Sequence, residues 1–255
     1  MISQNKRKLI RALEQKKKRD TESLFVAEGR KTVGDLLRGG LTATYIAATA
    51  ERLAELGAAA AGAERVEADA AEIAEVSALS TRSEILAIFR KPKCEPTLPT
   101  PGALMLALDG IQDPGNLGTI IRTADWFGVT DIVCTSACAD AYGPKAVQAT
   151  MGALARVRVA YTDLAKWLAA NAERGAEAAR VFGTYLEGDN IYRKELPQGG
   201  IILMGNEGHG ISAELGKFVT DKLFIPSFPA GRPTSESLNV GTATAIALSE
   251  FRRRG

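Results

Sequence analysis

The chain has 255 residues, of which 45% are hydrophobic and 24% charged, and its formal net charge is +2. That is ordinary globular composition, with enough length for one large domain or two small ones. No apolar run approaches the roughly 20 residues of a membrane span, and the polar, basic N-terminus lacks the apolar segment of a secretory signal, so we expect a cytoplasmic protein without a membrane partner.

The cysteines do not predict a disulfide framework or a metal site. There are three, Cys94, Cys134 and Cys138, and an odd count in a chain of this size argues against a disulfide framework. Cys134 and Cys138 are close in sequence, but His209 is the only histidine and no second cysteine pair completes a tetrahedral set. We therefore interpret these cysteines as small core residues and expect no metal.

Basic residues gather at both ends of the chain. Residues 1–20 hold Lys6, Arg7, Lys8, Arg11, Lys16, Lys17, Lys18 and Arg19, and the chain closes with Arg252, Arg253 and Arg254. Such clusters suit a polyanionic partner, because each basic group that neutralises a phosphate releases counterions. A solvated helix face with a frayed tail explains the same pattern, and the sequence leaves both interpretations open.

The first hundred residues predict a small alternating α/β region. Periodicity and breaker residues indicate helices over 3–18, 31–40, 50–62 and 70–78, and strands over 23–29, 43–49, 64–69 and 84–91. Residues 91–102 then hold four prolines, which deny a helix and remove ladder donors. We place the domain boundary there, with one domain over 1–97 and another over 103–255.

The second domain is predicted to be a mostly parallel sheet with helices on both faces. Strands are expected over 104–109, 131–135, 156–161, 181–186, 201–204 and 223–225, and helices over 117–128, 143–154, 162–179 and from 240 onward. Polar loops follow several of these strands, and ligands bind at the carboxyl ends of strands in such folds. Three polar sets stand in or beside these loops: Asn116 with Arg122, Asn206 with Glu207, and Ser237 with Asn239.

Several common chemistries fit the sequence poorly. Gly208, Gly210 and Ala213 nominally match a dinucleotide fingerprint, but that fingerprint opens its fold and needs an acidic residue about 20 positions on. No Gly-x-Ser-x-Gly elbow accompanies His209, and no Walker-type loop occurs. A nicotinamide or flavin enzyme, a serine hydrolase and an NTPase are therefore disfavoured.

Three ordered stretches carry a specific resemblance. LDGIQDPGNLGTIIRTADWFGV (108–129), ILMGNEGHGIS (202–212) and IP (225–226) followed by ESLNVGTATAIAL (236–248) resemble the three motifs of the SpoU/TrmH family of RNA 2′-O-methyltransferases, in the SPOUT superfamily. ATMGAL (149–154) resembles a segment between the first two motifs, and FVAEGRKTVGDLL (25–37) resembles a substrate-binding domain with an L30e-like fold.

The resemblance implies a fold, a cofactor and a set of site residues. It implies an L30e-like domain before a SPOUT domain that contains a trefoil knot, a homodimer, and S-adenosylmethionine bound through the knotted loops. The implied cofactor-binding residues are Met204, Gly205, Asn206, Gly210, Ile225 and Leu238. The implied active-site residues are Asn116, Arg122, Glu207, Ser237 and Asn239. The segment 227–236 is longer than is usual in the family, so its path around the cofactor and its RNA contacts are expected to differ.

The resemblance implies methyl transfer to a ribose 2′-hydroxyl of RNA, with ribosomal RNA favoured and tRNA left open. Arg122 is expected to stabilise the developing alkoxide, because a guanidinium scarcely loses its proton in proteins; the family has also been described with this arginine as a general base. Glu207 is expected to fix its loop, and Asn116, Ser237 and Asn239 to orient the reacting groups. A noncatalytic RNA-binding protein that retains the fold is the competing interpretation.

Overall fold

The structure is a computed structural model that describes residues 1–79, 83–229 and 235–253. It forms two compact units. The N-terminal unit consists of residues 1–93 together with 140–156, and the C-terminal unit consists of residues 94–139 together with 157–255. The chain first crosses from the N-terminal to the C-terminal unit between residues 93 and 94, within the proline-rich segment 91–102. Both units are mixed α/β, which confirms the predicted fold class.

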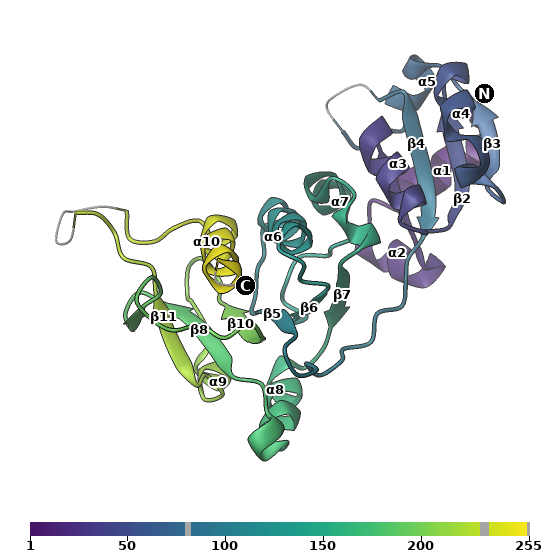
Figure 1. The fold of residues 1–255 in the computed structure, drawn as a ribbon. Coiled ribbons are helices and arrows are strands. Elements are labelled where there is room, and N and C mark those ends of the chain that lie inside the picture. The colour runs from purple at the N-terminus through teal and green to yellow at the C-terminus, as the bar shows by residue number, and fades with distance from the viewer. Residues whose placement is uncertain (80–82, 230–234, 254–255) are drawn as a thin grey trace. The chain divides into compact units, whose positions relative to one another are not determined.

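A four-stranded sheet forms the centre of the N-terminal unit (Figure 1). Its strands are β1 (Leu24–Glu28), β2 (Ala43–Ala48), β3 (Glu64–Glu67) and β4 (Ile85–Arg90), in the order β1-β4-β2-β3. Strand β4 is antiparallel to both neighbours, and β2 and β3 are parallel. The helices are α1 (Gln4–Ala12), α2 (Lys16–Glu22), α3 (Arg30–Arg38), α4 (Ala50–Leu56), the 3-10 turn η1 (Gly57–Ala60) and α5 (Ala70–Ala74).

The single helix predicted over residues 3–18 is wrong. It breaks after α1 and restarts as α2. The Arg19 guanidinium donates to the carbonyl oxygens of Leu13 and Glu14, both at 2.7 Å, and these are acceptors that a continuous helix would use for its own N–H groups. Arg19 is 4% exposed, so a buried side chain stabilises the break.

Residues 140–156 pack with the N-terminal sheet rather than with the sheet that precedes them. They form α7 (Pro144–Thr150) and the 3-10 turn η2 (Ala153–Ala155). Asp140 accepts two hydrogen bonds from Arg19, at 2.7 and 2.9 Å, and both side chains are buried. Gly152 has a φ of +89°, and a Cβ there would lie 2.4 Å from Asp35 Cβ. A helix-breaking glycine therefore lets this segment approach α3 closely.

The C-terminal unit is built on a seven-stranded sheet in which every pairing is parallel. Its strands are β5 (Leu104–Leu108), β6 (Asp131–Cys134), β7 (Arg158–Tyr161), β8 (Val181–Tyr185), β9 (Asp189–Asn190), β10 (Gly200–Met204) and β11 (Asp221–Phe224). The order is β7-β6-β5-β10-β8-β11-β9. The short edge strand β9 is not predicted by the sequence, because two residues carry no periodicity.

Helices cover both faces of this sheet, as expected (Figure 1). On one side α6 (Pro114–Trp126) packs against α10 (Val240–Arg252), and Phe251 meets Phe182 of β8 edge to face at 5.0 Å. On the other side are α8 (Leu164–Ala172), the 3-10 turn η3 (Gly175–Glu177) and α9 (Ala213–Gly216). Among the described residues, no helix has the length and apolar character to cross a membrane.

Candidate active site at the carboxyl edge of the parallel sheet

Residues 205–212 form a tight loop that connects β10 to α9, and we call them the β10 loop. Its start requires glycine, because a Cβ at Gly205 would lie 2.2 Å from the backbone carbon of Gly210. Asn206 and Gly210 pair through two backbone hydrogen bonds of 3.0 and 2.9 Å. The Asn206 side-chain oxygen also accepts the N–H groups of Gly208 and His209, at 2.8 and 3.3 Å. These internal hydrogen bonds therefore define the shape of the loop.

The β10 loop is also fastened to the end of β5. The side-chain amide of Asn206 donates to the carbonyl of Gly110 at 2.7 Å. The carboxylate of Asp109 accepts the N–H of Ser212 at 2.9 Å. Sequence reasoning missed Asp109 and Ser212 as site residues. Asp109 had a detectable signal, because it is the polar residue that ends the apolar run of β5.

A chain of side-chain hydrogen bonds joins three distant segments. Asn239 donates to the side-chain oxygen of Asn116 at 2.8 Å, and Asn116 donates to Glu207 at 2.7 Å. Two local caps hold these groups in place: Asp113 accepts the Asn116 N–H at 2.7 Å, and Asn239 accepts the Thr242 N–H at 3.2 Å. The structure thus brings together three of the five predicted active-site side chains.

The other two predicted active-site residues lie outside this chain. Arg122 is exposed on α6, and no group in the described parts of the protein hydrogen-bonds or pairs with its guanidinium. Ser237 is exposed and likewise makes no hydrogen bond within the described residues. Within the described residues, the Arg122 cation and the Ser237 hydroxyl are therefore available to a ligand.

The predicted cofactor-binding residues on the strand ends belong to two strands that are separated by one other strand in the sheet. Met204 ends β10, Ile225 follows β11, and β8 lies between these two strands in the sheet. Ile225 is half-buried, and Leu238 is 46% exposed. Thr184, near the end of β8, directs its hydroxyl to the Met204 sulfur at 3.7 Å. Sequence reasoning missed Thr184, whose position between the two predicted cofactor strands depends on the strand order.

The segment 227–236 lies partly outside the described residues, which omit 230–234. The Phe228–Pro229 peptide bond is cis, and the Phe228 side chain is 81% exposed. Arg254 of the C-terminal basic cluster also lies outside the described residues. Within them, Arg252 donates to the carbonyl of Phe127 at 3.0 Å, and Arg253 pairs with Glu250 at 3.0 Å.

Cys134 and Cys138 belong to the core around β6, whereas Cys94 is only half-buried in the proline-rich segment, so the expectation of a core residue does not hold for it. Cys134 is buried at the end of β6, and the Cys138 sulfur accepts the N–H of Ile111 at 3.2 Å. A hydrogen bond with Cys134 lowers the pKa of Cys138 to about 7 against the opposing effect of burial, while the pKa of Cys134 is raised. Across the part of the chain that the structure describes, no three His, Cys, Asp or Glu side chains are grouped to hold a metal.

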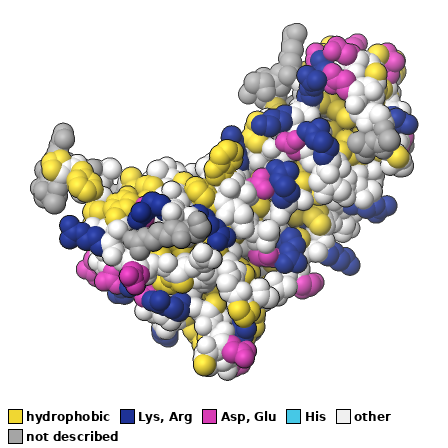
Figure 2. All heavy atoms as spheres, viewed as in Figure 1, with side chains coloured by type: hydrophobic (Ala, Val, Ile, Leu, Met, Phe, Trp, Pro, Cys, Tyr) yellow, Lys and Arg dark blue, Asp and Glu magenta, His cyan; other side chains and the backbone are white. Residues whose placement is uncertain are grey.

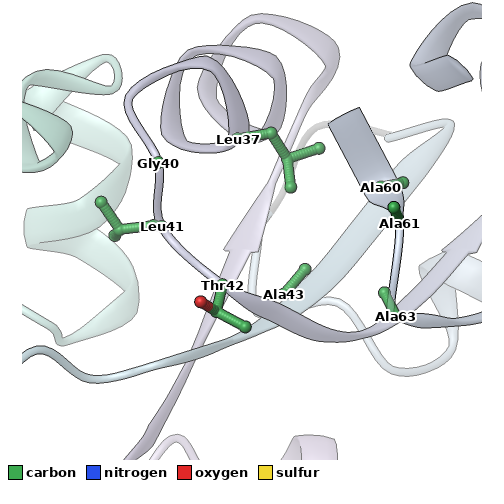
Figure 3. A pocket seen from close by; sticks show the side chains of 8 residues that line it. All are labelled: Leu37, Gly40, Leu41, Thr42, Ala43, Ala60, Ala61 and Ala63. Carbon is green, nitrogen blue, oxygen red and sulfur yellow. The ribbon is translucent and has the colours of Figure 1, made fainter. Parts of the chain in front are cut away.

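A pocket of about 180 Å³ lies in the N-terminal unit, between the end of α3, β2 and η1 (Figure 3). Its lining contains one polar side chain, Thr42, among alanine, leucine and glycine residues such as Leu37 and Ala60. This pocket lacks the groups needed to activate a nucleophile or to bind a charged ligand. The polar groups that could do so gather at the carboxyl edge of the C-terminal sheet.

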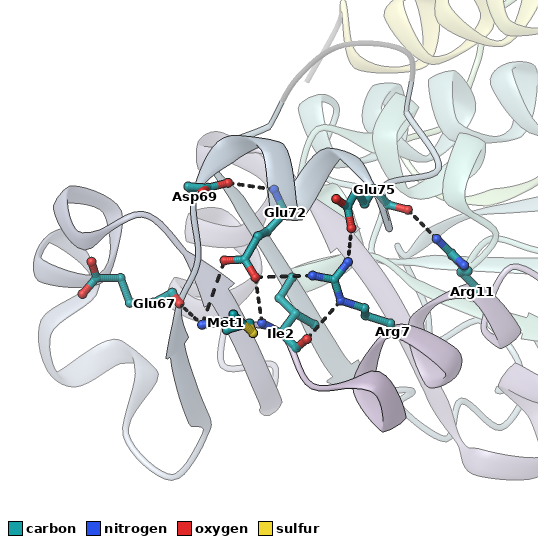
Figure 4. Close-up of polar contacts among 8 residues, drawn as sticks. All are labelled: Met1, Ile2, Arg7, Arg11, Glu67, Asp69, Glu72 and Glu75. Atoms are coloured by element: carbon teal, nitrogen blue, oxygen red, sulfur yellow. Dashed lines mark hydrogen bonds and ion pairs between the residues drawn. The ribbon is translucent and has the colours of Figure 1, made fainter.

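The basic N-terminal segment is largely neutralised within its own unit. Arg7 pairs with Glu72 and Glu75, and Arg11 donates to the Glu75 carbonyl at 2.9 Å (Figure 4). Lys6 pairs with Glu64, Lys18 with Glu22, and Arg19 with Asp140. Basic and acidic side chains are interspersed on the face seen in Figure 2. Lys8 and Lys17 are exposed and make no ion pair with the described residues.

Comparison with known proteins identifies the class that this fold and site define. Residues 103–249 match the SpoU rRNA Methylase family, and residues 4–87 match the MRM3-like substrate binding domain. The chain belongs to the SpoU rRNA Methylase family. It is an RNA 2′-O-methyltransferase with an N-terminal substrate-binding domain and uses S-adenosylmethionine.

Individual relatives agree with this assignment. The chain is 34% identical over 179 residues to the 23S rRNA (guanosine(2553)-2′-O)-methyltransferase RlmP of Bacillus subtilis, covering 69% of this chain and 68% of that one. A TrmH-family RNA methyltransferase structure from Porphyromonas gingivalis shares 39% identity with a TM-score of 0.90, over all of both chains. An rRNA methyltransferase of Sinorhizobium meliloti with bound AdoMet shares 31% identity with a TM-score of 0.85, over 100% of this chain and 97% of that one.

Proposed function

We propose that this chain transfers a methyl group from S-adenosylmethionine to a ribose 2′-hydroxyl of ribosomal RNA. The observation that carries the proposal is the hydrogen-bond chain Asn239–Asn116–Glu207, which joins the three motif segments. Arg122 lies on the same helix as Asn116, and within the described residues its guanidinium makes no hydrogen bond or ion pair. The preference for ribosomal RNA rests on the relatives, since RlmP is named for a guanosine of 23S rRNA.

The residues at the strand ends suit S-adenosylmethionine. Leu238 exposes 46% of its surface and Ile225 is half-buried, so both offer apolar contact to a planar base. Gly205, Gly210 and Met204 would contact the cofactor through the main chain. The polar groups of Asn206 are largely used inside the β10 loop, so we assign it a contribution through loop shape.

Bound S-adenosylmethionine supplies an electrophilic methyl group on a sulfonium. The chain's own residues hold the ribose oxygen in line and stabilise the negative charge that grows on it. We assign the stabilising role to the Arg122 guanidinium, and the acceptance of the hydroxyl proton to an adjacent RNA phosphate. Asn116, Asn239 and Glu207 hold the segments in register, and Ser237 offers a hydroxyl to the ribose.

Methyl transfer from labelled S-adenosylmethionine to purified ribosomal RNA and tRNA tests this proposal. Arg122→Ala should abolish transfer while leaving cofactor affinity nearly unchanged. Arg158→Ala is the matched control, because Arg158 lies at the amino end of β7, away from the carboxyl edge that holds the candidate site, and pairs with Asp131. It should leave both methyl transfer and cofactor affinity nearly unchanged. Equal loss of transfer and cofactor binding in Arg122→Ala would contradict its role. Cofactor binding without transfer to either RNA pool in the unaltered protein would favour a noncatalytic RNA-binding protein.

We further propose that the N-terminal unit docks RNA through its remaining exposed cations. Lys8 and Lys17 are the candidates from the first twenty residues, because most of the others already have acidic or carbonyl partners. Charge reversal of both should weaken RNA binding and reduce the slope of log affinity against log salt by about 0.7 for each lost phosphate contact. Reversal of Glu22 should act in the opposite direction and strengthen RNA binding, because it adds a cation and releases Lys18 from its ion pair. Removal of residues 1–97 is a poorer test, because it strips residues 140–156 of their packing partners.

We propose that the chain is a cytoplasmic homodimer with a trefoil knot near its C-terminal end, as the family resemblance implies. Trp126 supports a partner surface, because it is 84% exposed on the same helix as Arg122. Dimerisation over this surface should protect Trp126 from acrylamide quenching as protein concentration rises. Trp167 is 6% exposed and serves as the internal reference. Quenching independent of concentration, with a monomeric mass, would refute the homodimer.

An experimentally determined backbone path over residues 200–253 tests the trefoil knot.

A further inference from the structure

Asp109 touches both ends of the β10 loop. Its backbone N–H donates to the carbonyl of Met204, the last residue of β10, at 2.9 Å. Its carboxylate accepts the N–H of Ser212, where the loop ends and α9 begins, at 2.9 Å. One residue at the end of β5 thus bonds to the residue that precedes the loop and to the residue that completes it.

The contacts inside the loop and the contacts that fasten it have different effects. The bonds between Asn206 and residues 208–210 give the loop its shape, but they would persist if the whole loop tilted away from the sheet. Among the residues that the structure describes, two hydrogen bonds tie residues 205–212 to the turn after β5. These are Asn206 to Gly110 and Ser212 to Asp109.

The position of the loop determines where Glu207 lies. Glu207 is exposed at the loop's centre, and its carboxylate accepts the 2.7 Å hydrogen bond from Asn116. A tilt of about 1 Å would stretch that bond beyond hydrogen-bond range. It would also displace Gly205 and Gly210, which we have assigned to the cofactor. The Asp109 side-chain oxygen is therefore an acceptor whose removal would leave the Ser212 N–H without this bond.

We propose that Asp109 is a positioning residue that clasps the β10 loop onto β5, and thereby sets cofactor affinity and the placement of Glu207. The proposal rests on the proposed function for its effect on cofactor binding. The clasp itself is a property of the chain that is measurable without cofactor. The requirement is for a hydrogen-bond acceptor at this point, so an asparagine in place of Asp109 should serve and an alanine should not.

Calorimetry of S-adenosylmethionine binding and amide hydrogen exchange test the clasp in the full-length chain. Asp109→Ala should weaken cofactor binding about tenfold or more and speed exchange of the Ser212 amide by a similar factor. Asp109→Asn should stay within about threefold of the unaltered protein in both. Ser212→Pro removes the donor at a residue whose φ is already −60°, and it should match the loss of Asp109→Ala in affinity. Combining the two changes should add little further loss, because they remove the same bond.

Asp163→Ala is the matched control, because Asp163 also accepts a backbone N–H, from Lys166 at 3.1 Å, where α8 begins. It should lower stability without changing cofactor affinity. The proposal is overturned if Asp109→Ala binds cofactor as tightly as the unaltered protein, if Asp163→Ala loses as much affinity, or if Asp109→Asn is as damaging as Asp109→Ala. If the unaltered protein binds no cofactor, the proposed function fails. Ser212 exchange then decides the clasp: faster exchange in Asp109→Ala supports it, and equal exchange overturns it.

Discussion

Replacing Gly205 by alanine should disable the β10 loop. The added Cβ would lie 2.2 Å from the Gly210 carbonyl carbon, 2.3 Å from the Ile211 nitrogen and 2.5 Å from the Gly210 oxygen. Carbon atoms attract one another only from about 3.5 Å outward, so the backbone strands of the loop must separate by more than an ångström. Because all three obstructing atoms belong to the main chain, no side-chain rotation relieves the clash.

The cost follows from the hydrogen bonds that such a separation breaks. The two backbone bonds between Asn206 and Gly210 would be lost, at about 0.5–1.5 kcal/mol each, or about 1–3 kcal/mol together. If the cofactor binds only the closed loop, its affinity should fall about tenfold to a hundredfold. Isothermal titration calorimetry with S-adenosylmethionine measures this directly, with circular dichroism to show that the sheet remains folded.

The same loop provides a control for this prediction. A Cβ at Gly208 would meet only the Asn206 side-chain oxygen, at 3.4 Å, which is ordinary contact. Gly208→Ala should therefore bind cofactor nearly as well as the unaltered protein. If Gly205→Ala and Gly208→Ala bound equally tightly, the close approach of Gly205 to Gly210 would have no role in cofactor binding, and the reasoning would be refuted.

Three further substitutions test the hydrogen-bond chain and two ion pairs, the first through turnover and the other two through the free energy of unfolding. Asn239→Asp keeps the side-chain oxygen that caps α10 but loses the amide that donates to Asn116. Turnover should therefore fall about tenfold while the melting temperature stays unchanged. Unchanged turnover would contradict a role for the hydrogen-bond chain in catalysis. Asp140→Ala leaves the buried Arg19 guanidinium without its carboxylate and should cost about 3 kcal/mol in urea unfolding, whereas a loss below about 1 kcal/mol would show that water replaces the partner. Burial alone would raise the pKa of Asp221. The hydrogen bonds that its carboxylate accepts, the strongest of them from Arg180, have a larger effect in the opposite direction and hold the pKa at about 2. Because that pKa lies below the unfolded value of about 3.9, this carboxylate contributes up to about 2 kcal/mol above pH 4, and the contribution disappears as pH falls toward 2. Urea unfolding across that range should show a smaller pH dependence in Asp221→Asn, and an identical dependence would refute the assignment.

The sequence alone determined the alternation of strands and helices and the class of the protein. Local patterns carry this information: a continuous apolar run such as Leu104–Leu108 is buried on both faces, and the helical spacing of Val240, Ala247 and Phe251 places one face inward. The ordered motifs by themselves indicate the family. They also selected Asn116, Glu207 and Asn239, which the structure joins across separations of 91 and 123 residues.

Only the tertiary structure decided which side chains are already in use. Arg7, Lys6 and Arg19 look like free cations in the sequence, but each meets a carboxylate from a distant segment. The passage of residues 140–156 into the N-terminal unit depends on packing against α3 and β1 rather than on any break in the local pattern. Asp109 is the clearest case. Its role depends on the N–H group of Ser212, 103 residues away in the chain. Hydrophobic periodicity reports only local structure and does not predict such a hydrogen bond.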